Sequence, residues 1–117
     1  MEIREQRDGG VATITLTGRL TVNDQPGVLK DAVTGALRRG ARNVLLDLSG
    51  VPYIDSTRLG ELIGAHVTVS RQGGQLRLVA TPPRIMELLQ LAGLGGVFVH
   101  YDSAAAARAD LDTGPQG

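Results

Sequence analysis

The sequence predicts one α/β domain built on a mostly parallel central sheet, with an antiparallel hairpin at its start and about four helices. Three observations support this fold class. Strand-like and helix-like stretches alternate along most of the chain, which favours right-handed crossovers between parallel strands. The first two strand-like stretches flank a glycine turn, as in a β-hairpin. The whole chain has 117 residues, the size of a single domain with one core.

The hairpin is the clearest of the strand predictions. A turn is expected at residues 8–10, and after it Ala12, Ile14 and Leu16 alternate with threonines, which predicts a strand with one buried face. The strand predicted at residues 44–48 opens with a continuous apolar run, which is typical of a central strand covered on both faces. Two further strands are predicted, at residues 76–80 and 97–99.

Four stretches predict helices. Pro26 suits the first turn of the first helix, because its missing N–H costs nothing there, and Gly40 ends the apolar pattern. The second helix opens at residues 55–57, where three short oxygen-bearing side chains form a helix-start signal, and runs to about Gln72. The other helices are predicted after Pro83, with Ala92 pointing inward near the end, and at residues 104–111. We assign residues 1–112 to the domain and residues 113–117 to a disordered tail.

The composition argues against several classes of protein. Basic and acidic residues number 12 each, so the zero net charge gives no reason to expect nucleic acid or an anionic membrane as a partner. Cysteine is absent, which excludes disulfides and thiolate metal sites. No segment approaches about 18 consecutive apolar residues and the first residues are charged, so we expect a soluble, cytoplasmic protein.

Three features that resemble chemical sites have simpler explanations. His66 and His100 lack a carboxylate or a second histidine at ligand spacing, so we expect no metal or cofactor site there. The glycine-rich residues 93–96 follow a helix and precede a strand, which fits a helix end and a tight turn better than a phosphate-binding loop. Asp47 ends a strand, as the phosphorylated aspartate of a receiver domain does, but the other residues of that site are missing, and a hydrogen bond to the following loop explains it. No catalytic set can be assembled, so no enzymatic activity is predicted.

Ser56 is the strongest candidate for a functional residue. If the helix starts at residue 56 or 57, the hydroxyl lies beside backbone N–H groups that have no partner within the helix. Phosphorylation would add about 1.5 to 2 negative charges next to Asp55. The helix dipole tolerates that charge, whereas a partner packed over the loop does not. The alternative is that Ser56 is a plain N-cap.

Four motifs, in the same order, resemble those of STAS domains, the fold of bacterial anti-sigma-factor antagonists. The segment IDSTRLG at residues 54–60, preceded by LDL at 46–48, resembles the D-S-S/T-G-L-G signature of that family. The other motifs are TGRL at 17–20, GGQLRL at 73–78 and PRIMELLQLAGL at 83–94. The resemblance therefore covers nearly the whole chain and adds the STAS fold to the expectation of an α/β domain.

The resemblance implies a specific regulatory role. Antagonists of this type bind an anti-sigma factor, itself a GHKL-type serine kinase, and so release the sigma factor for transcription. The kinase uses ATP to phosphorylate the serine after the motif aspartate, which is Ser56 here, and a PP2C-type phosphatase reverses the modification. On this interpretation the domain is a substrate and a binder, with no activity or cofactor of its own.

The resemblance and the predicted topology also define an expected contact surface. Its residues are Thr21, Asn23, Asp24, Asp55, Thr57, Arg58 and Leu59. Arg58 replaces the glycine of the family signature, and Thr21 replaces an acidic residue. We hypothesise that Arg58 pairs with phosphoserine or reshapes the docking surface. The alternative function is an unswitched STAS interaction module, as a signalling scaffold or a soluble partner of a transport complex, in which Ser56 only caps the helix.

Overall fold

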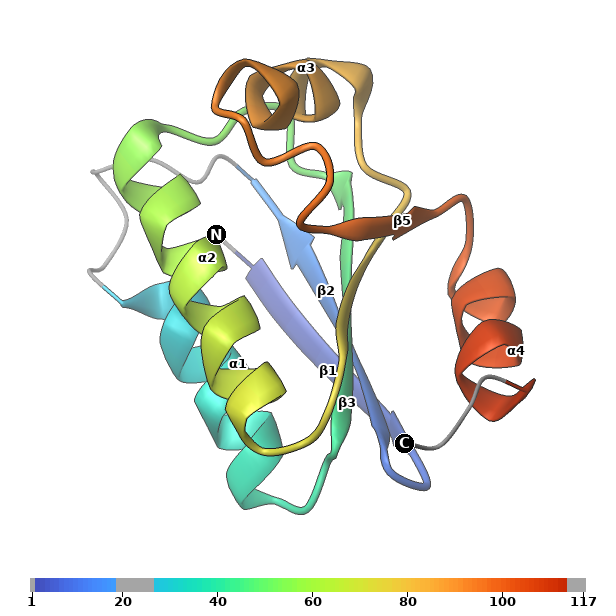
Figure 1. The fold of residues 1–117 in the computed structure, drawn as a ribbon. Coiled ribbons are helices and arrows are strands. Elements are labelled where there is room, and N and C mark those ends of the chain that lie inside the picture. The colour runs from blue at the N-terminus through green and yellow to red at the C-terminus, as the bar shows by residue number, and fades with distance from the viewer. Residues whose placement is uncertain (1, 19–26, 114–117) are drawn as a thin grey trace.

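The computed structural model describes residues 2–18 and 27–113, which form one five-stranded sheet flanked by four helices (Figure 1). In chain order the elements are β1 (Glu2–Asp8), β2 (Val11–Thr17), α1 (Val28–Arg38), β3 (Asn43–Gly50), α2 (Ser56–Arg71), β4 (Leu76–Val79), α3 (Pro83–Leu91), β5 (Val99–Tyr101) and α4 (Ala104–Thr113). The order and type of these elements agree with the sequence prediction.

The sheet has the strand order β1-β2-β3-β4-β5, so β3 lies at its centre. β1 pairs with β2 in antiparallel register through a two-residue turn, with Asp8 opposite Val11 and Gly9 at a φ of 63°. All other neighbouring strands are parallel. The α/β class, the parallel sheet and the N-terminal hairpin are therefore confirmed.

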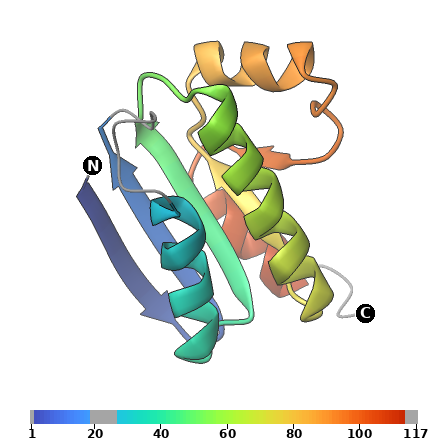
Figure 2. The ribbon, with the colours of Figure 1, turned by 90° about the vertical axis from the view of Figure 1, so that its left-hand side faces the viewer.

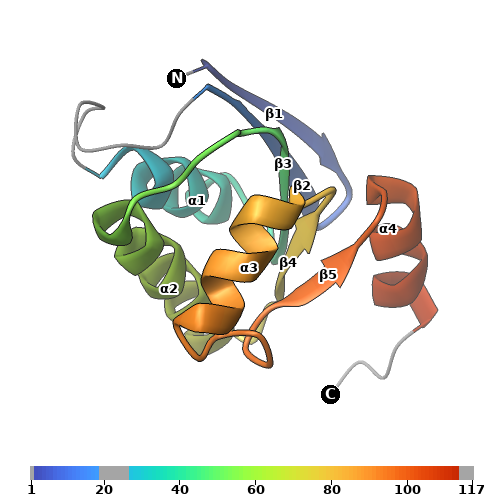
Figure 3. The same ribbon diagram turned by 90° about the horizontal axis from the view of Figure 1, so that it is seen from above.

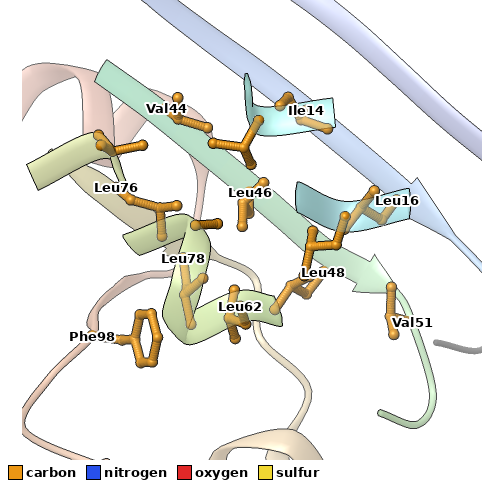
Figure 4. Packing of buried hydrophobic residues seen from close by; sticks show 14 of the residues in the cluster. Ile14, Leu16, Val44, Leu46, Leu48, Val51, Leu62, Leu76, Leu78 and Phe98 are labelled. Carbon is orange, nitrogen blue, oxygen red and sulfur yellow. The ribbon is translucent and has the colours of Figure 1, made fainter. Parts of the chain in front are cut away.

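The two faces of the sheet are covered unequally. Helices α1, α2 and α3 lie on one side, and α4 lies alone on the other (Figures 2 and 3). The larger core packs inward-facing residues of β2, β3 and β4 against the helices of the first side (Figure 4). The smaller core joins Leu45 and Val79 of the sheet to Ala107 and Leu111 of α4. Because β3 contributes to both cores, it is buried on both faces, as its apolar run predicted.

The ends of some elements differ from the prediction. The last strand begins at Val99, not at residue 97, because Phe98 turns into the main core, where its ring lies edge-on to that of His66 with the ring centroids 5.2 Å apart. Ala92 follows the last residue of α3 and is exposed, so its predicted inward position was wrong. The final helix extends to Thr113, one residue beyond the predicted domain end. Pro26 lies outside the described residues.

The described helices are all too short or too polar to cross a lipid bilayer.

Candidate functional site

The loop between β3 and α2 is held in place at the point where it leaves the sheet. The carboxylate of Asp47 accepts a hydrogen bond from the backbone N–H of Ser49 at 2.9 Å, as predicted for this residue. The carbonyl of Gly50 accepts a hydrogen bond from the N–H of Gly18 at 2.9 Å. A Cβ at residue 50 would lie 3.1 Å from the carbonyl oxygen of Leu16, so glycine allows this close approach to β2. The loop that leads to α2 therefore starts from a fixed position.

The start of α2 is set by Asp55, which is its N-cap. The Asp55 side chain accepts a hydrogen bond from the backbone N–H of Arg58 at 2.9 Å, and its carbonyl accepts one from the N–H of Leu59 at 2.9 Å. Ile54, just before the cap, and Leu59, in the first turn, are both buried in the main core, in the positions of a hydrophobic staple. The interpretation of Ser56 as a plain N-cap was therefore wrong, because Asp55 does the capping.

Ser56 is the first residue of α2, and its side chain is exposed. No hydrogen bond joins the Ser56 hydroxyl to another described residue. The N–H groups of Ser56 and Thr57 belong to the first helical turn, where an N–H has no partner four residues earlier within the helix. The first turn of α2 contains no acidic side chain. The geometry therefore offers a reachable hydroxyl next to unpaired N–H groups at the positive end of the helix dipole.

Arg58 points into the protein. Its side chain is only 3% exposed and forms an ion pair with Glu61, one turn further along α2, whose side chain is 15% exposed. The second oxygen of that carboxylate, Glu61 Oε1, is buried and has no partner among the described residues. The hypothesis that Arg58 pairs with phosphoserine or reshapes the docking surface stays a prediction, and in the unmodified domain the guanidinium is paired with Glu61. The structure thus buries this cation beside Glu61 of the same helix.

Comparison with known families decides what kind of domain presents this serine. Residues 3–100 match the family described as "Mlab, STAS domain", which is most of the chain. The chain belongs to the STAS domain family.

Curated relatives of this STAS domain are bacterial regulators. It is 24% identical over 112 residues to the anti-sigma F factor antagonist of Paenibacillus polymyxa, covering 96% of both chains. It is 32% identical over 81 residues to the anti-sigma-B factor antagonist of Bacillus subtilis, covering 69% of this chain and 72% of the relative. Both relatives are named for the same role.

Solved structures share the fold. An anti-sigma-factor antagonist (STAS) domain protein from Planctomyces limnophilus superposes with a TM-score of 0.80 at 20% identity, covering 95% of this chain and 98% of that one. The phosphorylated form of the Bacillus protein SpoIIAA superposes with a TM-score of 0.70 at 16% identity, covering 92% of this chain and 98% of that one. The STAS fold predicted from the sequence motifs is thereby confirmed.

The other predicted contact residues divide into three groups. Thr57 is exposed and Asp55 is half-buried, so both border Ser56 at the surface. Leu59 is 7% exposed and belongs to the core. Thr21, Asn23 and Asp24 lie outside the described residues. The described part of this STAS domain thus brings Asp55, Ser56 and Thr57 together as one surface patch.

The histidines and the glycine-rich segment have structural roles in this STAS domain. His66 packs on Phe98, and His100 Nδ1 lies 3.3 Å from the hydroxyl oxygen of Thr81. Partial burial lowers the pKa of His100 from its ordinary value. Gly93 ends α3 with a φ of 76°. Within residues 2–18 and 27–113, no group of three or more His, Asp or Glu residues could hold a metal ion.

Two features near Ser56 were missed from the sequence. Glu61, the partner of Arg58, lies three residues further along the helix, and the helical spacing of opposite charges was a usable signal. Tyr53 and Arg84 form a cation–π contact, with Arg84 Cζ 5.5 Å from the ring centroid. They are far apart in the chain, so no local pattern could have paired them.

Proposed function

We propose that this STAS domain is an anti-sigma-factor antagonist that is switched off by phosphorylation of Ser56. In its unmodified form it binds an anti-sigma factor, which is also a GHKL-type serine kinase, and so releases a sigma factor for transcription. The kinase transfers the γ-phosphoryl group of ATP to the Ser56 hydroxyl, and a PP2C-type phosphatase hydrolyses the phosphoester. These steps take place in the cytoplasm, and the domain itself catalyses none of them.

This proposal rests on one observation: Asp55 caps α2, and Ser56 does not. Asp55 satisfies the N–H of Arg58, so the helix does not need the Ser56 hydroxyl as a cap. The hydroxyl is exposed, as a kinase requires of the oxygen that it modifies. A serine with these two properties can change its chemistry without loss of a contact that holds the fold.

Electrostatics explain how the modification could act as a switch. A phosphate at the first position of α2 adds about 1.5 to 2 negative charges, and the helix dipole stabilises negative charge there by about 1 kcal/mol. A partner that covers the same patch must strip water from a dianion beside the Asp55 carboxylate, which costs several kcal/mol unless new cations pair with it. Phosphorylation therefore weakens the complex and leaves the domain folded.

The proposed contact surface is centred on the exposed patch of Asp55, Ser56 and Thr57. Thr21, Asn23 and Asp24 remain part of the proposal. Arg58 and Leu59 contribute indirectly, because their side chains are buried. The names of the curated relatives support this role, and the phosphorylated form of SpoIIAA supports the idea that the fold accepts a phosphate.

A displacement assay tests the proposal. The candidate kinase is a GHKL-type protein chosen from the genes around the one that encodes this chain. Its complex with a fluorescently labelled sigma factor is mixed with the STAS domain. We expect wild type and Ser56→Ala to release the sigma factor, and fully phosphorylated wild type to release none. Equal release by the phosphorylated and unmodified proteins would contradict the switch.

An unswitched interaction module is the second candidate. The observation that favours it is Arg58, which replaces the glycine of the family signature and forms a buried ion pair with Glu61 in the first turns of α2. A first turn built in this way suits a partner that differs from the usual kinase. In that case the candidate kinase would leave Ser56 unmodified, and a partner would bind equally to wild type and Ser56→Asp.

A further inference from the structure

A groove lies beside the proposed switch, between the β3–α2 loop and α3. It has a volume of about 250 Å³ and is lined by Tyr53, Ile54, Arg84, Ile85, Glu87, Leu88 and Leu91. Figures 1 and 2 show α3 next to the loop that enters α2. The Leu91 side chain is 80% exposed and Tyr53 is 40% exposed. These are the kinds of large side chain that usually gain from being covered.

The size of the groove indicates side chains as its occupants. Sites for whole small molecules are usually about 300 to 1,000 Å³ and enclose most of the ligand. This groove is smaller and open along one side. It therefore fits one or two apolar side chains of a protein partner.

One end of the groove carries a cation that is already oriented. Arg84 stacks on Tyr53, which limits the orientations that its side chain can adopt. No ion pair joins Arg84 to any acidic side chain in the described parts of the chain. An arginine held on an aromatic ring still presents N–H donors at the edge of its planar group, where a carboxylate can bind. Glu87 also lines the groove, three residues after Arg84, so the complementarity to a carboxylate is confined to Arg84 itself.

The opposite end of the groove is apolar. Arg84, Leu88 and Leu91 follow one another at helical spacings of four and three residues, so they form one stripe along α3. Seven residues of helix span about 10.5 Å. A partner helix lying along this stripe would match it with a carboxylate and a large apolar side chain placed about seven residues apart, the usual arrangement of a helix bound in a groove.

We propose that this groove binds an amphipathic helix of the same anti-sigma factor kinase, with a carboxylate at Arg84 and an apolar side chain between Leu88 and Leu91. This inference rests on the proposed function, because it extends the contact of that partner beyond Ser56. Tyr53 stands three residues before Ser56 in the same segment, so a partner that covers the serine reaches the groove without a gap. The groove provides binding energy that does not depend on the modified residue.

Binding of the candidate kinase, measured by calorimetry in the absence of ATP, tests the groove with two variants. Leu91→Asp and Arg84→Glu change exposed side chains, so thermal unfolding should match wild type. We expect Leu91→Asp to raise the Kd at least tenfold and Arg84→Glu about fivefold. Two matched controls lie outside the groove on α2: Val67→Asp, at a side chain 39% exposed, and Arg71→Glu, in the last turn. We expect both controls to stay within twofold of wild type.

The outcomes separate this inference from the proposed function. If wild type binds the kinase and both groove variants bind equally well, the groove proposal is overturned and the antagonist role stands. If the groove variants instead change the oligomeric state of the free protein and leave kinase affinity unchanged, the groove joins two copies of this chain, and the proposal is again overturned. If wild type itself fails to bind, both proposals fall.

Discussion

The chain contains the dipeptide Asp-Ser at two helix starts, and the two serines do different jobs. At α4 the Ser103 hydroxyl accepts a hydrogen bond from the N–H of Ala106 at 3.1 Å, so Ser103 is used as a cap. At α2 the aspartate caps, and Ser56 is the first helical residue with an exposed hydroxyl. Both serines are exposed, so exposure alone does not distinguish them. What differs is whether the helix needs the oxygen.

A shift of one residue in the helix start causes this difference. Ile54 and Leu59 flank the cap of α2, and both are buried in the main core, which fixes where that helix begins. The residue in the corresponding place before Ser103 is Asp102, which is exposed and cannot form such a staple. The α2 start is thus determined by the core, and the α4 start by the capping preference of serine. A serine becomes available for modification where packing, not its own hydroxyl, sets the helix start.

The largest expected effect is on binding at Ser56. Ser56→Asp should raise the Kd for the candidate kinase about a hundredfold, equivalent to about 2.8 kcal/mol, because a second carboxylate beside Asp55 must be desolvated. Ser56→Asn has nearly the same shape without the charge and should bind like wild type. Calorimetry measures both constants. Equal affinities for the two variants would show that the added charge is not what weakens binding.

The next effect concerns the ion pair of Arg58 and Glu61 in the first turns of α2. Arg58→Ala should lower the free energy of unfolding by about 2 to 3 kcal/mol, because Glu61 is left nearly buried without its cation. The exposed pair of Arg39 and Glu5, with side chains 57% and 19% exposed, is the matched control, and Arg39→Ala should cost less than about 1 kcal/mol. Urea unfolding compares the two. Similar losses in both variants would mean that burial does not strengthen the Arg58–Glu61 pair.

A smaller effect tests which residue caps α2. Asp55→Ala should destabilise the protein by about 1 to 2 kcal/mol through loss of the hydrogen bond to the Arg58 N–H. Asp55→Asn keeps a capping oxygen and should stay within about 0.5 kcal/mol of wild type. Thermal unfolding of both variants in the same buffer measures the difference in their stability. A neutral Asp55→Ala would show that another group caps the helix.

The smallest effect compares the two serines directly. Ser103→Ala should cost about 0.5 to 1 kcal/mol, because it removes the cap of α4, whereas Ser56→Ala should change the free energy of unfolding by less than about 0.5 kcal/mol. Chemical unfolding of the two variants under the same conditions provides the test. A greater loss of unfolding free energy for Ser56→Ala would show that the Ser56 hydroxyl stabilises the fold.

Much of the fold could be predicted because it follows from local pattern. The alternation of Ala12, Ile14 and Leu16, and the apolar run that opens β3, placed two neighbouring strands correctly. The start of β5 could not be placed, since Phe98 looks like a strand residue but is buried in the main core, where it also contacts His66. Local propensity does not contain that contact.

The sequence identified the residues of the candidate site, but it did not predict their contacts or their burial. The residues Asp55, Ser56 and Thr57 were recognisable as a helix start, but any of the three could have capped it. The sequence did not show that the Arg58 side chain is buried where it pairs with Glu61. The Tyr53 and Arg84 contact depends on two segments that meet only after folding. Each of these was decided by tertiary packing.

Phosphosite mapping after incubation with the candidate kinase and ATP tests the central claim most directly, because both serines are present in one molecule. Mass spectrometry should find one phosphate per chain at Ser56 and none at Ser103, with the thermal unfolding midpoint of the modified protein close to that of the unmodified one. Phosphate at Ser103, or phosphate at Ser56 that unfolds the domain, would contradict the claim that modification acts on a hydroxyl which the fold does not use.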